Sequence, residues 1–74
     1  MKLELTDCVL KVNGTVVASD DVLIRIASDL SLGDIPIQVN KLGLTVDEIS
    51  ILAEYLEQKV LMEGYCDKTL EDGK

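Results

Sequence analysis

The sequence contains no histidine, no tryptophan and no phenylalanine. Histidine is the side chain most often used for general acid–base catalysis, so its absence removes the pairs of Cys or Ser with His that form catalytic nucleophiles. The two cysteines, Cys8 and Cys66, are too far apart in sequence for a zinc or redox motif. The acidic residues do not follow the spacing of a calcium-binding loop either. We therefore expect neither an enzyme nor a protein that holds a metal or another cofactor.

Basic residues are also scarce. There are 7 Lys and Arg against 14 Asp and Glu, which gives a net charge of −7. A surface of this sign repels phosphate backbones and anionic lipid headgroups, so we expect no direct binding to nucleic acid or to a membrane. The chain has no basic leader followed by an apolar stretch and no apolar run of about 18 residues. The sequence therefore predicts a soluble cytoplasmic protein with reduced thiols.

A chain of 74 residues is enough for one small domain, close to the lower limit of independent stability. We expect a single α+β domain over residues 1–64 and a frayed acidic tail over residues 65–74, in which Leu70 is the only aliphatic residue. A core without Trp or Phe is small. An apolar surface that this core leaves uncovered would therefore be a natural place to gain stability by self-association.

The run from Thr45 to Gly64 predicts a long helix. Thr45 followed three residues later by Glu48 is a capping box, in which each side chain accepts a hydrogen bond from the backbone N–H of the other residue. Gly64 is the natural end, because glycine adopts the left-handed C′ conformation at little cost. The apolar residues of this run recur with a helical period on one stripe, which we expect to face the core: Val46, Ile49, Leu52, Ala53, Leu56 and Val60.

A second apolar surface is expected on the same helix. At about 100° per residue, Ile51, Tyr55 and Met62 fall together on the side opposite the core stripe. We call these three residues the second apolar ridge. They are too much apolar surface for a solvated helix face, so we predict that they bind a partner, with Tyr55 as the anchor because interfaces concentrate energy in aromatics with a polar tip.

Charged side chains separate the two apolar surfaces of this helix. One flank is acidic and carries Asp47, Glu54 and Glu57. The other flank mixes both signs and carries Glu48, Lys59 and Glu63. The acidic flank has two interpretations: a solvated helix face, which favours solubility, or a set of carboxylates that takes the place of phosphates.

A β-hairpin is expected around Asn13-Gly14, because both residues tolerate the positive φ of a type I′ turn. In a two-residue loop Val12 pairs with Thr15, and Leu10 pairs with Val17. Upstream, the apolar residues change from odd to even positions. Since side chains alternate between the two faces of a strand, we expect a bulge or break near Asp7.

The segment from Ser19 to Gly33 predicts a second, shorter helix. Ser19 offers a capping hydroxyl, and Asp20-Asp21 place two carboxylates at the positive end of the helix dipole. Gly33 ends the element. The spacing of the apolar residues favours the helix, whereas the β-branched content of residues 22–27 favours a strand, and both possibilities stay open.

A third strand is expected after this helix. Ile35, Ile37 and Val39 alternate, and Pro36 confines such a strand to a sheet edge because proline has no backbone donor. The expected fold class is therefore α+β in the order ββαβα: a β-hairpin and a short edge strand packed by one short and one long C-terminal helix.

Together these features predict a small acidic protein-binding module, such as an adaptor, regulator or inhibitor, that acts through the second apolar ridge. The partner would be a second copy, giving a homodimer, or another protein. A simpler explanation is that the ridge packs against the hairpin or the tail of its own chain. The alternative function is an acidic nucleic-acid mimic that blocks the basic cleft of a DNA- or RNA-processing enzyme, as some small acidic proteins of phage and plasmid origin do.

Overall fold

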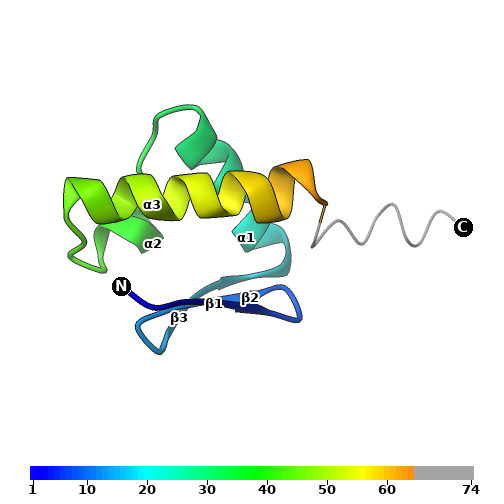
Figure 1. Cartoon of the computed structure of the whole chain (residues 1–74), viewed down its shortest axis with the longest axis horizontal. Coiled ribbons are helices and arrows are strands. Elements are labelled where there is room, and N and C mark those ends of the chain that lie inside the picture. Colours follow the sequence, from blue (N-terminus) through cyan, green and yellow to red (C-terminus); the bar gives the residue numbers. More distant parts are fainter. Residues whose placement is uncertain (65–74) are drawn as a thin grey trace, which may run out of the picture.

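The computed structural model describes residues 1–64, which form a three-stranded antiparallel sheet covered on one face by helices (Figure 1). The strands come first and the helices follow, so the expected α+β fold class is confirmed. The tail predicted over residues 65–74 lies outside the described residues. In chain order the elements are β1 (Leu3–Thr6), β2 (Val9–Val12), β3 (Thr15–Ser19), α1 (Asp20–Ser31), α2 (Ile37–Asn40), α3 (Val46–Leu56) and the π-helical segment η1 (Glu57–Met62).

Two tight turns connect the strands in the order β1-β2-β3. Asn13 and Gly14 have φ of 54° and 83°, as the predicted type I′ turn requires. The break predicted near Asp7 is confirmed, but it is a full chain reversal: Asp7 and Cys8 have φ of 52° and 62° and form a second turn of the same kind. Leu5 of β1 therefore lies across from Leu10 of β2.

The pairing of β2 with β3 contains a bulge. Val12 pairs with Thr15 as predicted, but Leu10 pairs with Ala18 rather than with Val17. The predicted Leu10–Val17 pair is wrong because Val17 is an extra residue in β3, which shifts the register between Leu10 and Lys11. As a result Ala18 turns into the core, where the regular register would have placed it on the outer face.

Residues 20–31 are helical, so the strand alternative for residues 22–27 is wrong. The two acids of the first turn are present, but the predicted cap is not: the Ser19 side chain makes no capping hydrogen bond. The helix ends in a Schellman motif. There the Gly33 N–H donates to the Leu30 carbonyl at 3.1 Å and the Asp34 N–H donates to the Asp29 carbonyl at 2.8 Å, with Gly33 at φ 91°.

The edge strand predicted from Ile35, Ile37 and Val39 is wrong, because this segment forms the single-turn helix α2. Pro36 begins the turn with its fixed φ of −63°, and its carbonyl accepts the N–H groups of Val39 at 3.0 Å and Asn40 at 2.9 Å. Val39 alone of the three apolar residues is buried. One turn of helix therefore anchors the loop through a single side chain.

The predicted capping box begins α3, with both of its hydrogen bonds in place. The rod then continues through η1 in the same direction (Figure 1). In η1 the hydrogen bonds span five residues, as between the Glu63 N–H and the Gln58 carbonyl at 3.1 Å, so the long helix was right in extent but not α-helical throughout. Gly64, with φ of 67°, follows its end as predicted.

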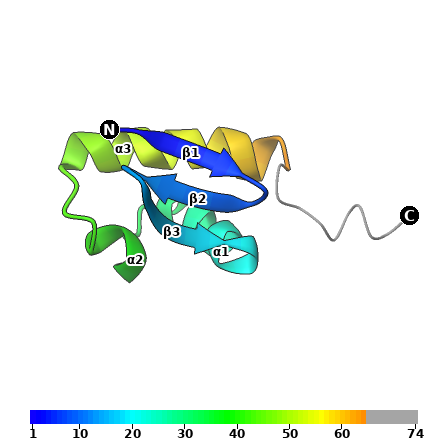
Figure 2. The same cartoon turned by 90° about the horizontal axis from the view of Figure 1, so that it is seen from below.

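The hydrophobic core lies between the sheet and the helical layer. Figure 2 shows the strands in front of the helices, with α1, α3 and η1 behind the same sheet face. Of the stripe predicted for the long helix, Leu52, Leu56 and Val60 are buried, but Val46 is 79% exposed. The buried core residues are Cys8, Leu10, Val12, Ala18, Leu23, Ile26, Ala27, Leu30, Val39, Leu52, Leu56 and Val60.

Candidate functional site

Exposed apolar side chains gather on the helical layer of the molecule and the loops that join its helices. Such side chains are normal when scattered singly, whereas a large contiguous patch of them is typical of an interaction surface. The strands contribute Val16, and the N-terminus contributes Met1. The helical layer and its loops contribute Val22, Leu32, Ile35, Ile37, Val46, Ile51, Leu61 and Met62.

The second apolar ridge is only partly covered by its own chain. Ile51 is 55% exposed and Met62 is 77% exposed, whereas Tyr55 is half-buried and packs against the core. Ile51 and Tyr55 are four residues apart in α3, so they are neighbours on its surface. Their role as partner-binding residues stays a prediction.

Met62 belongs to η1, and this changes its place relative to the rest of the second apolar ridge. A π-helical turn holds more residues than an α-helical turn, so the positions after Glu57 no longer advance by about 100° each. Met62 therefore leaves the line that Ile51 and Tyr55 define. It joins Leu61 as an exposed apolar side chain at the C-terminal end of the rod.

The acidic flank follows the outer side of the same rod. Asp47 and Glu54 of α3 and Glu57, the first residue of η1, are all exposed. This exposure fits a solvated helix face and equally fits a surface that meets a basic partner.

An apolar groove lies on the other side of the acidic flank, and the sequence did not indicate it. It has a volume of about 240 Å³ and lies between the C-terminal end of α1 and the first half of α3. Ile35, at 53% exposed, and Val46 are its most open apolar residues. The residues that line it are Leu30, Gly33, Asp34, Ile35, Val46, Ile49, Ser50 and Ala53.

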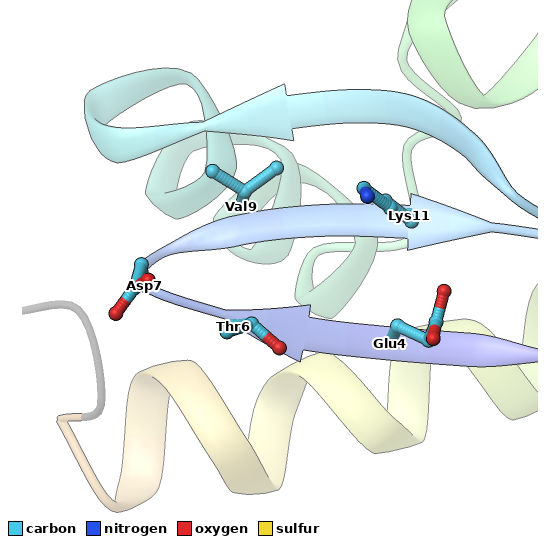
Figure 3. A pocket seen from close by; sticks show the side chains of 5 residues that line it. All are labelled: Glu4, Thr6, Asp7, Val9 and Lys11. Atoms are coloured by element: carbon cyan, nitrogen blue, oxygen red, sulfur yellow. The ribbon is translucent and has the colours of Figure 1, made fainter.

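The outer face of the sheet carries a shallow polar hollow of about 270 Å³ (Figure 3). Glu4 and Thr6 come from β1, Val9 and Lys11 come from β2, and Asp7 comes from the turn between these strands. Glu4 and Lys11 are directly opposite each other in the strand pairing. The hollow is an open face lined by short polar, acidic and basic side chains.

Within residues 1–64 no three His, Cys, Asp or Glu side chains are grouped so that they could hold a metal ion. Cys8 is a free, buried thiol of the core, and Cys66 lies outside the described residues. None of the described helices is long and apolar enough to span a membrane.

Comparisons with protein-family models, with curated proteins and with solved structures gave no match to this chain. We therefore infer the function from the surfaces described above.

Proposed function

We propose that the protein is a small cytoplasmic protein-binding module, of adaptor, regulator or inhibitor type, that docks through the second apolar ridge, with a second copy of the chain as its first partner. The observation that supports this most is that two apolar side chains of one rod are exposed: Ile51 in α3, and Met62 farther along, where η1 displaces it from the line of Ile51 and Tyr55. Burying a large apolar side chain fully contributes about 1.5–3 kcal/mol relative to leaving it exposed. Covering these two partly exposed side chains would therefore contribute favourable free energy to association.

The neighbourhood of the ridge suits a symmetric dimer. In a two-fold interface each copy presents the same patch, so a useful patch carries charges of both signs beside its apolar centre. Lys59 and Glu63 are exposed and Glu48 is half-exposed along the mixed flank. Tyr55, half-buried, would present its remaining surface as the anchor.

Aspartate substitutions at the two exposed ridge positions test this proposal. We expect the wild-type mass measured by light scattering to rise from 8.1 kDa toward twice that value with concentration. Ile51→Asp and Met62→Asp should stay folded by circular dichroism and remain monomers, because an interfacial carboxylate loses its hydration. Tyr55 is unsuitable for this purpose, since it packs against the core and its replacement would unfold the domain.

Val16→Asp is the matched control. Val16 is 59% exposed, close to Ile51, but it lies in the sheet rather than on the rod. Its replacement should leave the dimer intact. A wild-type protein that remains monomeric at millimolar concentration, or a dimer that both ridge variants retain, would contradict self-association through the ridge.

The acidic nucleic-acid mimic is the second candidate, and the exposure of Asp47, Glu54 and Glu57 supports it. Carboxylates along one side of a rod could occupy a basic cleft in place of phosphates. Such binding depends on charge and should weaken strongly in half-molar salt, because the Debye length falls to about 4 Å. Inhibition of a nuclease or polymerase that persists undiminished at that salt concentration would count against the mimic.

A further inference from the structure

The groove between α1 and α3 is a separate surface from the second apolar ridge. Its floor includes Leu30, which is buried, and its open edge includes Ile35 and Val46. At about 240 Å³ it is below the usual range for small-molecule sites, about 300–1,000 Å³. This volume matches one or two inserted apolar side chains.

The margins of the groove are acidic. Asp34 is part of its lining, and among the described residues that line it none is Lys or Arg. Glu57 lies one helical turn beyond Ala53 on the same side of the rod, since its N–H donates to the Ala53 carbonyl. An apolar centre is therefore bordered by carboxylates and by no lining cation.

We propose that this groove binds a cationic amphipathic helix of another protein. An apolar side chain of that helix enters between Ile35 and Val46, and its Lys or Arg residues meet Asp34 and Glu57. Helices dock in such grooves through apolar residues spaced by three or four positions, which leaves the flanking positions free for charge. A second copy of this chain is a poor occupant, because a chain with a net charge of −7 brings like charge to an acidic margin. The mixed flank beside the second apolar ridge carries charges of both signs, so like-charge repulsion does not oppose self-association there. Self-association through the ridge and helix binding in the groove can therefore fail independently.

Three synthetic peptides of about 18 residues, or five helical turns, provide a defined test. All three carry leucine at the same amphipathic positions. The remaining positions are all lysine in the first peptide, all glutamine in the second and all glutamate in the third. Binding is measured by fluorescence anisotropy of labelled peptide, and the site is mapped from backbone amide shifts of the ¹⁵N-labelled full chain. We expect the lysine peptide to bind, with the largest shifts in residues 33–35 and 46–53. The glutamate peptide should not bind, and the glutamine peptide should bind at least tenfold more weakly.

Variants separate the groove from non-specific attraction to an acidic protein. Val46→Ala removes two carbons and Ile35→Ala removes three. At ~0.8 kcal/mol per buried CH₂ these changes should weaken binding of the lysine peptide by about 15-fold and about 60-fold if the peptide buries these carbons fully. Glu57→Gln should weaken binding and reduce its dependence on salt. The matched controls are Val16→Ala and Glu4→Gln, which make comparable changes on the sheet and should leave the affinity unchanged.

Several results would overturn the proposal. One is equal binding of the lysine and glutamine peptides, which would remove the role of charge. Another is a shift map centred on Ile51 and Met62, which would place the peptide on the second apolar ridge. A third is undiminished affinity in folded Ile35→Ala and Val46→Ala. If Val46→Ala instead abolished self-association, the occupant of the groove would be a second copy.

Discussion

Replacing Thr45 with alanine removes the cap from which α3 begins. The Thr45 Oγ1 accepts the Glu48 N–H at 3.2 Å, and the Glu48 Oε1 accepts the Thr45 N–H at 3.0 Å. Thr45 is exposed, so its substitution changes little buried area. Any loss of stability therefore measures the hydrogen bond and not the packing.

The expected loss is about 1 kcal/mol for Thr45→Ala, within the range of about 0.5–2 for such caps. Thr45→Gly should cost only a few tenths, because glycine at this position leaves the helix N–H groups open to water. Thr45→Ser keeps the hydroxyl and should match the wild type closely. In a domain of this size a loss of about 1 kcal/mol lowers the melting temperature by about 4–8 °C.

Urea unfolding followed by circular dichroism at the helical band measures these free energies. All variants must be compared at one protein concentration, because a dimer would make stability depend on concentration. A double-mutant cycle with Glu48→Ala should give a double loss smaller than the sum of the single losses, since each bond holds the other in place. Equal free energies of unfolding for Thr45→Ala and Thr45→Ser would refute the assignment of this capping box as the start of α3.

The remaining expectations concern the core and the turns. Leu52→Ala, at a fully buried site, should cost about 2.7–5 kcal/mol and leave much of the protein unfolded at 25 °C, whereas Val16→Ala should change stability by less than about 0.5 kcal/mol in the same urea assay. Gly33→Ala should cost about 1 kcal/mol or more although no atom lies within 4 Å of the added carbon, because φ is +91°; a neutral melting temperature would contradict this. Cys8→Gly should be more stable than Cys8→Ala by about 1 kcal/mol, because φ at Cys8 is 62° and glycine adopts positive φ at little cost. In regular helices and strands alanine is the more stable of the two. Equal stability of the two variants would show that the turn conformation carries no cost.

Local signals in the sequence were sufficient where neighbouring residues alone decide the conformation. The Thr45–Glu48 box involves atoms only three residues apart, and it predicted the first residue of α3 correctly. Asn13-Gly14 likewise predicted its turn, because the positive φ values are properties of the two residues themselves. The parity change before Cys8 indicated a break, although not that the break reverses the chain.

The errors arose where packing decides between local alternatives. A five-residue alternation with one proline fits an edge strand and a helical turn equally well, and the burial of Val39 against the sheet favours the helical turn. The bulge at Val17 could not be foreseen from period-two alternation, which assumes a regular register. The groove depends on the path of residues 33–36 between two helices, and no residue spacing encodes that path.

For the second apolar ridge, the helical period predicted one position correctly and was insufficient for the other two. The helical period identified Ile51 as an outward-facing residue, and it is exposed. The same period placed Tyr55 and Met62 beside it. Tyr55 is its neighbour in α3 but is half-buried against the core, and the π-helical hydrogen bonds of η1 displace Met62. A change from α to π geometry has no clear signature in six residues of ordinary helix formers.

The most direct test of docking through the second apolar ridge is an isotope-filtered NOE experiment on an equal mixture of ¹³C-labelled and unlabelled chains at millimolar concentration. Such cross peaks arise only between protons in different copies. We expect them at the methyl groups of Ile51 and Met62, and none at Val16. Docking through the ridge would be contradicted if neither methyl group gave such cross peaks and the sample diffused as an 8.1 kDa monomer.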